Sequence, residues 1–389
     1  MSSEKTKEKI PINCQVLKWA RESKRLEIEE VAHKLKYTPE IIKEWEAGMS
    51  TPSYAQLEKL AYDIYKRPLV TFFLDEIPKE KDLKTDFRTL PERIIDAFSP
   101  DLIKYIREAR DKQFILRELF PKGNPSKKFL LNHFKTDKSD PEKTAHDLRD
   151  FLDISFDRQK DFKSPEEAYR IIREILAEHG VFVFQYAINR NEARGFCLYD
   201  EEFPVILVSS KEDEVSARIF TIFHEVAHLI FQTSGITTIS EQVGFRNKQG
   251  EEIEIFCNKF SADVLVPRKF LLEHALVKNR KGRSWDATEL KKIAKDFNVS
   301  VEVIFRRLVD FGRADKSEYE AYRNQPYSKK KISGGPTYAI KTVAQLGTSF
   351  IRVVLNNLYS GHITPYQASN YLRIKANNIG KIEAIVFSG

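Results

Sequence analysis

Apolar residues recur every three or four positions over long parts of this chain, the spacing that gives a helix one buried face. Between residues 12 and 74 the pattern predicts four or five short helices, each with one apolar stripe. Gly48 ends one of these stripes, and Pro52 and Ser53 precede the next. We therefore expect residues 1–75 to form a small all-α domain.

A second pattern begins at Ser164 and Pro165, a capping serine followed by a proline in the first turn of a helix that ends at Gly180. Three runs rich in β-branched and aromatic residues follow, at Val181–Phe184, Phe196–Tyr199 and Val205–Val208. They predict a small, mainly antiparallel sheet. Helical spacing then returns over about residues 214–231.

The predicted fold class is therefore α+β and mostly helical. Four regions are expected: the all-α domain (1–75), a charged helical connector (76–160), a domain with the small sheet (161–312), and a linker with a small helical C-terminal domain (313–389).

Composition narrows the class of protein. Hydrophobic residues make up 41% and charged residues 31% of the 389, and no apolar run approaches the length of a membrane span. The N-terminus lacks the apolar core of a signal peptide, so we expect a cytoplasmic protein. Cys14, Cys197 and Cys257 lie far apart and are interpreted as reduced thiols rather than metal ligands.

Charge is distributed unevenly along the chain. The net charge is −5 over residues 1–267 and +12 over residues 268–389. Electrostatic attraction for nucleic acid or an acidic partner is thus expected in the last third of the chain, although solvated surface lysines are an alternative interpretation.

The clearest chemical motif is His224-Glu225-Val226-Ala227-His228, on an apolar run with helical spacing. Histidines four residues apart share one helix face, so both imidazoles can reach one metal ion. Zinc peptidases use this H-E-x-x-H pattern, in which the glutamate acts on the metal's water without binding the metal. A buried helix with a satisfied histidine pair is the alternative.

A catalytic zinc site needs a third protein ligand. If residues 251–267 form a helix, Glu251, Glu254, Asn258 and Ser261 share one polar face. Spacing alone does not choose between Glu251 and Glu254. Asn258 lies one turn after Glu254 and could orient its carboxylate.

A family resemblance makes that choice. Arg218, His224, Glu225 and His228, followed by Glu254-x-x-Cys257-Asn258-x-Phe260-Ser261-Ala262, resemble the ImmA/IrrE family of metallo-endopeptidases. The resemblance implies Zn²⁺ held by His224, His228 and Glu254, with Glu225 as general base. This chain departs from the family at Cys257 and Ser261, where the family has alanine.

A second resemblance covers the N-terminal helices. Leu26–Ala32 and Trp45–Gly48, followed by Pro52 and Ser53, are similar to the helix-turn-helix domains of XRE-type repressors. The DNA contacts that it implies are Lys36, Tyr37, Thr38, Glu40 and Lys43. Glu40 and Glu44 are acidic, however, and residues 12–74 carry a net charge of only +1, so dimerisation or partner binding is an alternative.

Together these features predict a zinc-dependent endopeptidase that acts in gene regulation by cleaving a protein substrate, such as a helix-turn-helix repressor. The helix-turn-helix domain would recruit this substrate to an edge strand near Val205–Val208. DNA is a second candidate partner, a homodimer is compatible with the pattern, and no membrane is expected. The alternatives are a non-catalytic DNA-binding regulator with a structural or vestigial metal site, and a toxin or phage-defence protease.

Overall fold

The structure is a computed structural model. It describes residues 11–24, 26–65, 67, 69–78, 87, 95–96, 98–134, 140–189, 191–212, 214–237, 248–323 and 337–387. The chain divides into two compact units. Residues 1–82 and 98–106 form the first, and residues 83–97 and 107–389 form the second.

The first unit is helical, as the periodicity predicts. Its elements are α1 (Cys14–Glu22), α2 (Ile28–Leu35), α3 (Pro39–Glu46), α4 (Tyr54–Lys59), the π-helix η1 (Leu60–Tyr65) and the 3-10 helix η2 (Leu69–Phe73). Their apolar stripes meet in one core that includes Leu17, Val31 and Trp45. Within it the Arg21 guanidinium donates to the buried Glu46 carboxylate at 2.7 Å, which ties α1 to α3.

The second unit contains a four-stranded sheet of mixed direction. Its strands are β1 (Phe182–Tyr186), β2 (Gly195–Leu198), β3 (Val205–Ser209) and β4 (Ile236–Thr237), in the spatial order β1-β3-β2-β4. β1 pairs with β3 in parallel, whereas β2 pairs with β3 and β4 antiparallel. The predicted α+β class and the small, mainly antiparallel sheet are confirmed.

The prediction of an edge strand at Val205–Val208 is wrong. These residues belong to β3, which has β1 on one side and β2 on the other. Every residue of β3 is buried, because helices cover both faces of the sheet. Of the four strands, β1 and β4 form the edges.

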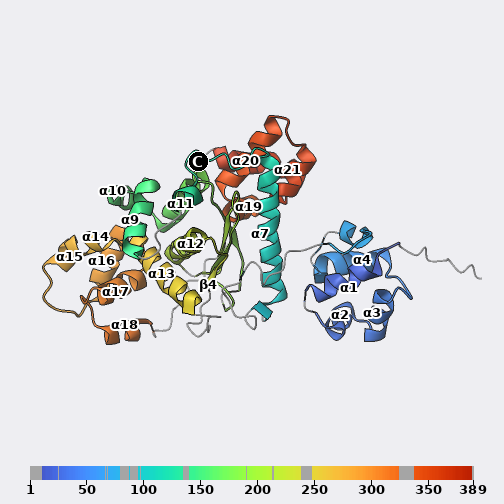
Figure 1. The fold of residues 1–389 in the computed structure, drawn as a ribbon, viewed down its shortest axis with the longest axis horizontal. Coiled ribbons are helices and arrows are strands. Elements are labelled where there is room, and N and C mark those ends of the chain that lie inside the picture. Colours follow the sequence, from blue (N-terminus) through green and yellow to red (C-terminus); the bar gives the residue numbers. More distant parts are fainter. Residues whose placement is uncertain are drawn as a thin grey trace, which may run out of the picture. The chain divides into compact units, whose positions relative to one another are not determined.

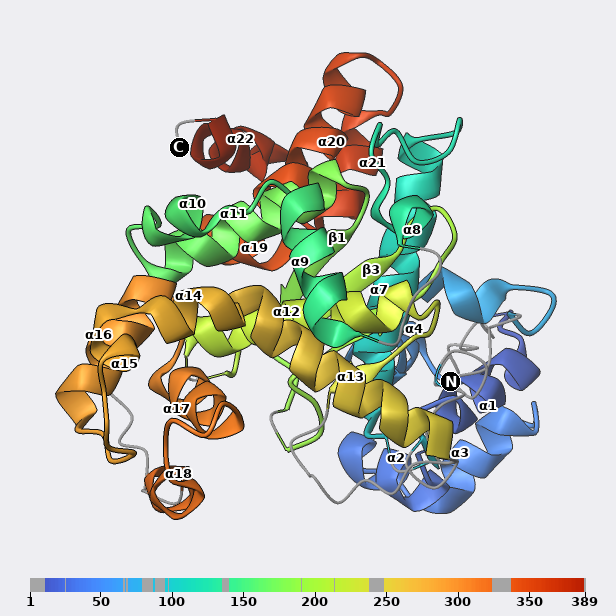
Figure 2. The same ribbon diagram turned by 60° about the vertical axis from the view of Figure 1, so that its left-hand side comes forward.

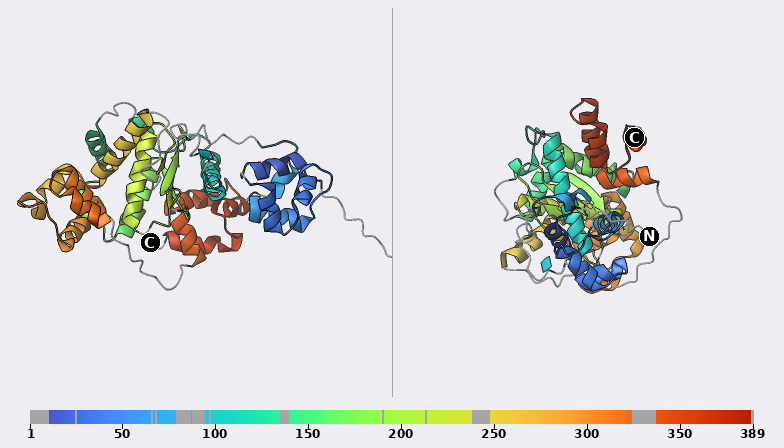
Figure 3. Two further views of the ribbon diagram at one scale, coloured as in Figure 1. Left: turned by 90° about the horizontal axis from the view of Figure 1, so that it is seen from below. Right: turned by 90° about the vertical axis from the view of Figure 1, so that its right-hand side faces the viewer.

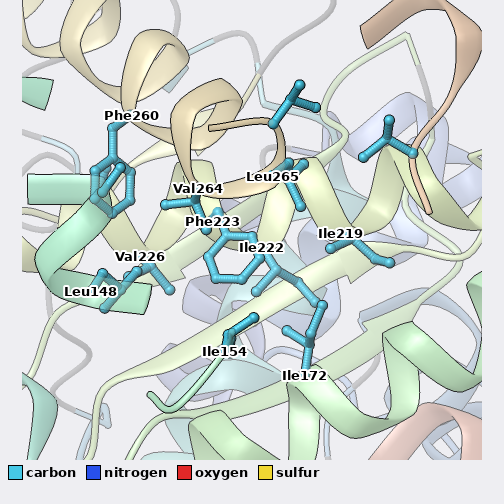
Figure 4. Close-up of a cluster of buried hydrophobic side chains, with 14 of the residues drawn as sticks. Leu148, Ile154, Ile172, Ile219, Ile222, Phe223, Val226, Phe260, Val264 and Leu265 are labelled. Carbon is cyan, nitrogen blue, oxygen red and sulfur yellow. The ribbon is translucent and has the colours of Figure 1, made fainter. Parts of the chain in front are cut away.

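Helices α11 (Pro165–Glu178) and α12 (Val215–Ile230) cover one face of the sheet (Figure 1). Val183, Cys197 and Ile206 point into the core on this side. Figure 4 shows the part of this core made by α12, where Ile219, Ile222, Phe223 and Val226 meet side chains of neighbouring helices. α12 is apolar almost all round, which suits a helix buried between a sheet and other helices.

On the other face, Phe184 and Phe196 point away from α12. Phe184 meets Phe350 edge to face, with ring centroids 5.2 Å apart. From residue 107 on, α7 (Pro100–Leu119) also lies on this side, and its Gln113 amide donates to the carbonyl of Leu198 at 3.1 Å.

Further helices complete the second unit. They are α8 (Leu130–His133), α9 (Pro141–Phe151), α10 (Phe156–Lys160), α13 (Lys248–Leu265), α14 (Arg268–Glu273), α15 (Ala275–Lys278), α16 (Ala287–Phe297), α17 (Val301–Asp310) and α18 (Lys316–Arg323). The C-terminal group comprises α19 (Tyr338–Leu346), α20 (Thr348–Tyr359), α21 (Pro365–Leu372), the 3-10 helix η3 (Ala376–Asn378) and α22 (Ile379–Phe387). In the described part of the chain, no helix is long and apolar enough to cross a membrane.

The C-terminal helices pack against the sheet. α19 contacts β1, and α20 contacts α11. The C-terminal helices are red in Figure 3, where they lie beside the strands. Arg173 of α11 links these elements, because its guanidinium donates to the carbonyls of Val183 at 2.7 Å and Ala344 at 2.8 Å. The β1 edge is therefore covered, and β4 is the edge on the opposite side of the sheet.

Candidate metal centre

The two motif histidines lie in the C-terminal half of α12, with His228 in its last turn. His224 and His228 are each 1% exposed, and their ring centroids lie 5.1 Å apart because one helical turn separates them. The predicted helix and the shared face are thus present. A pair of imidazoles this deeply buried requires a partner of its own, since buried polar groups are costly when left unsatisfied.

Helix α13, which packs against α12, supplies that partner (Figure 2). Glu254 Oε2 lies 3.1 Å from His224 Nε2, and Glu254 Oε1 lies 3.2 Å from His228 Nε2. One carboxylate therefore faces both imidazoles. Glu251, one turn earlier on α13, is exposed.

The surroundings of Glu254 and of His228 shift the pKa of each. Burial raises the pKa of Glu254, but His228 and His224 outweigh it and hold that pKa well below the ordinary range of a carboxyl. Burial lowers the pKa of His228, whereas Cys257 and Glu254 raise it and prevail. The site thus favours an ionised Glu254 carboxylate that faces a positively charged His228. A bound cation would stabilise the ionised carboxylate in the same way.

The unsatisfied atoms of the site fit a metal ion. Within the described residues, His224 Nδ1 and both ring nitrogens of His228 are buried without a hydrogen-bond partner. His228 Nε2 is close to Glu254, but the contact lacks the direction of a hydrogen bond. The Nε2 atoms of His224 and His228, which face Glu254, form with its carboxylate a donor set that suits zinc.

Glu225 is fully buried beside the histidines and is held by β4. The Thr237 hydroxyl donates to Glu225 Oε1 at 2.5 Å, and the Thr237 backbone N–H donates to the same oxygen at 3.1 Å. Glu225 Oε2 has no hydrogen-bond partner among the described residues. One carboxylate oxygen is therefore anchored by β4, and the other is not.

The chain also passes very close to His228 just before β4. A Cβ at Gly235 would lie 2.3 Å from both Cγ and Cδ2 of the His228 ring, so only glycine allows this approach. The Gly235 N–H donates to Cys197 Sγ at 3.3 Å. Gly235 and Thr237 thus join the end of the sheet to His228 and Glu225 of α12.

The structure places Cys257 at the site, although the cysteine spacing in the sequence indicated a reduced thiol and not a metal ligand. Cys257 is completely buried, and its sulfur and one ring nitrogen from each of His224 and His228 all lie within 4.8 Å of one another. Asn258, the next residue, is half-buried, and its role in orienting Glu254 stays a prediction. No signal in the sequence pointed to Thr237 or Gly235, which reach the site only through the fold.

The residues predicted to contact DNA lie on the first unit. Lys36, Tyr37, Thr38, Glu40 and Lys43 are all exposed, at the end of α2 and along α3. Tyr37 packs edge to face on Trp45, and its hydroxyl accepts from the Gln56 amide at 2.8 Å. This arrangement presents a mixed acidic and basic surface.

A buried helix with two histidines and a glutamate, an acidic residue from a second helix and a small sheet beside them define a metallopeptidase-type enzyme. Comparison with known families agrees with this class. Residues 176–309 match the IrrE N-terminal-like domain, and residues 17–61 match the Helix-turn-helix family. The chain therefore carries an ImmA/IrrE-type metallopeptidase domain behind an N-terminal XRE-type helix-turn-helix domain. A search of curated proteins found no match.

Proposed function

We propose that this protein is a zinc-dependent endopeptidase that cleaves a regulatory protein, such as a helix-turn-helix repressor, and so controls gene expression. The observation that carries the proposal is the Glu254 carboxylate, 3.1 and 3.2 Å from the two histidine Nε2 atoms, next to the anchored Glu225. His224, His228 and Glu254 are the proposed ligands.

Bound zinc would polarise a scissile carbonyl and lower the pKa of water at its open position. The protein's own part in the reaction falls to Glu225. Its Oε2 atom would take the proton of the attacking water and later pass it to the leaving amine. Thr237 would act as a positioning residue, because its two hydrogen bonds to Oε1 keep the carboxylate from turning away.

The substrate is expected to bind along β4. This strand is the sheet edge nearest Glu225, since Thr237 both belongs to it and contacts the carboxylate. An extended peptide that pairs with an edge strand gains main-chain hydrogen bonds whatever its side chains. Such binding discriminates weakly, so selectivity must come from another part of the chain.

We assign that selectivity to the helix-turn-helix domain. Glu40 and Glu44 are exposed on α3 and suit a basic protein surface better than phosphates. Tethering a partner protein by this surface would raise its local concentration to about the millimolar range, so that even a poor cleavage sequence is cut.

The experiment that tests the proposal compares Glu225→Gln with Glu251→Gln in the full chain. Glutamine is nearly isosteric with glutamate but cannot take a proton, so E225Q should keep its zinc and lose proteolysis of an unfolded protein. E251Q, on an exposed turn of α13, should retain both. Cleavage by E225Q at the wild-type rate would show that Glu225 is not the base.

A further inference from the structure

A cavity of about 310 Å³ lies in the second unit, where the C-terminal helices meet the sheet domain. From the sheet domain, α11, β1 and the first turn of α12 contribute to its wall; from the C-terminal group, α19, the start of α20 and α22 do. Its volume falls near the lower end of the range for small-molecule pockets, roughly 300–1,000 Å³. None of His224, Glu225 and Glu254 lines it, so it is separate from the metal centre.

Most of the cavity wall is apolar. Exposed residues such as Glu166 and Ile340 also line it, so the cavity opens to solvent. A molecule with an apolar body gains free energy when it leaves water for such a surface. Both parts of the wall supply apolar side chains, namely Phe182, Val215, Val343, Leu346, Phe350 and Ile385.

Two hydrogen-bond donors in the wall have no partner. Tyr169 is only 7% exposed, and its hydroxyl has no hydrogen-bond partner among the described residues. The same holds for Arg218 Nε, whereas Arg218 Nη2 donates to the carbonyls of Ser210 at 3.1 Å and Glu212 at 3.0 Å. Buried polar groups without partners are costly, so an acceptor that reached both donors would stabilise the protein.

Positive charge gathers beside these donors. Arg173 is 8% exposed, and its guanidinium donates to the backbone carbonyls of Val183, Ala344 and Gln345. In the described part of the chain, neither Arg173 nor Arg218 forms an ion pair with an acid. The central carbon of the Arg173 guanidinium lies 5.3 Å from the centroid of the Tyr169 ring. The polar part of the wall therefore favours an anion.

The Tyr169 hydroxyl is available as a donor to that anion. Burial raises the pKa of Tyr169, and the nearby charges of Arg173 and Arg218 oppose this only in part. The hydroxyl thus keeps its proton at neutral pH. The start of α20 adds to the positive potential, because Gly347, its N-cap, has no side chain to cap the helix and the positive end of the helix dipole borders the cavity.

We propose that this cavity binds a small monocarboxylate with an apolar body, such as a medium-chain aliphatic acid. Its carboxylate accepts from the Tyr169 hydroxyl and from Arg218 Nε, beside the charge of Arg173, and its chain lies along the apolar wall. A carboxylate suits two donors because it has two acceptor oxygens. A nucleotide suits the cavity less well, since a mostly apolar wall leaves its sugar and base without partners.

The site gives the C-terminal helices a role that goes beyond the proposed peptidase function. Both they and the sheet domain form the wall, so the bound acid contacts both and holds them together. A ligand that binds only the folded chain stabilises it, so the melting temperature should rise with the concentration of the acid. Neither the metal nor proteolysis is needed for this effect.

Titration calorimetry of the full-length protein with decanoate, below its micelle concentration, tests the proposal. Decanol has a similar apolar body without the charge, and butyrate has the charge with little of the body. Tyr169→Phe removes the hydroxyl and keeps the ring, and Val343→Trp fills the cavity. Tyr65→Phe is the matched control, because Tyr65 is also buried with an unpartnered hydroxyl but belongs to the first unit.

The expected result is about one decanoate per chain in the wild type and in Y65F, with a higher melting temperature in both. Y169F should bind decanoate about tenfold more weakly or worse, because it loses a hydrogen bond to a charged acceptor. V343W should not bind it. Decanol should bind the wild type at least about tenfold more weakly than decanoate, and butyrate at least about 100-fold more weakly.

Absence of decanoate binding to the wild type would overturn the proposal. Equal affinities of the wild type and Y169F would overturn it too, because the acid would then bind elsewhere, and this comparison decides even where V343W does not fold. Decanol bound as tightly as decanoate would exclude the carboxylate site. Each of these failures would leave the proposed peptidase standing, since zinc content and proteolysis are measured separately.

Discussion

Replacing Gly235 by alanine is the most direct test of how the fold shapes the site. The new Cβ would lie 2.3 Å from Cγ and Cδ2 of His228, whereas ordinary carbon contacts begin near 3.4 Å. Either the chain before β4 or the imidazole must therefore move by about 1 Å. The ring is buried and sits on a packed helix, so neither shift is cheap.

The magnitude follows from the size of that shift. Overpacking of this kind costs about 1–3 kcal/mol of stability, and a 1 Å displacement of a functional group can reduce activity about 100-fold. We expect Gly235→Ala to lower the melting temperature by several degrees, and to weaken zinc binding by about tenfold or more, because His228 is a proposed ligand.

The assay is competition for zinc against a chromophoric chelator, with thermal melting of the metal-free protein measured in parallel. Gly282→Ala and Gly380→Ala are matched controls, because a Cβ at either position meets no atom within 4 Å. Wild-type zinc affinity in Gly235→Ala would refute the reasoning, since the clash could then be relieved without moving His228.

Three further predictions concern other parts of the chain. Burial lowers the pKa of Lys112 to about 7. Above this pH the unfolded chain binds more protons than the folded one, so the free energy of unfolding should rise from pH 7 toward pH 10. Lys112→Met should raise the melting temperature at pH 6 and remove this rise, as thermal melts across the pH range would show. Non-specific DNA binding should depend more on the basic C-terminal third, so K291Q/K292Q/K295Q should reduce the salt slope by up to ~2.7, whereas K18Q/K34Q/K43Q should change it less. In titrations at several salt concentrations, the opposite order would exclude this division. Finally, E40K/E44K should slow cleavage of the native protein substrate and leave cleavage of a generic peptide unchanged. E58K/D63K is the control, and equal cleavage rates of the native substrate by E40K/E44K and the wild type would exclude recruitment by α3.

The elements that the sequence predicts well are those with local signals. Helical spacing predicted α1 to α4, α11 and α12. The resemblance chose Glu254 where spacing left Glu251 open. In the structure Glu254 faces the histidines, because the packing of α13 on α12 decides which turn of α13 points toward α12. That crossing depends on packing between distant segments and cannot be obtained from spacing.

The placement of β3 shows a signal that was present but misinterpreted. Val205, Ile206, Leu207 and Val208 form an uninterrupted apolar run, which is typical of a strand with both faces covered rather than of an exposed edge. Thr237 and Gly235 carried no comparable signal. Both reach the site through contacts between separate elements, so only the folded chain identifies them.

The central claim is that His224, His228 and Glu254 hold one zinc ion, and metal content tests it most directly. Zinc per chain would be measured in the purified wild type, in Glu254→Ala and in Glu251→Ala. We predict close to one zinc in the wild type and in E251A, and a clear loss in E254A, because Glu254 lies against the histidines whereas Glu251 is exposed. Full zinc content in E254A together with loss in E251A would contradict the account.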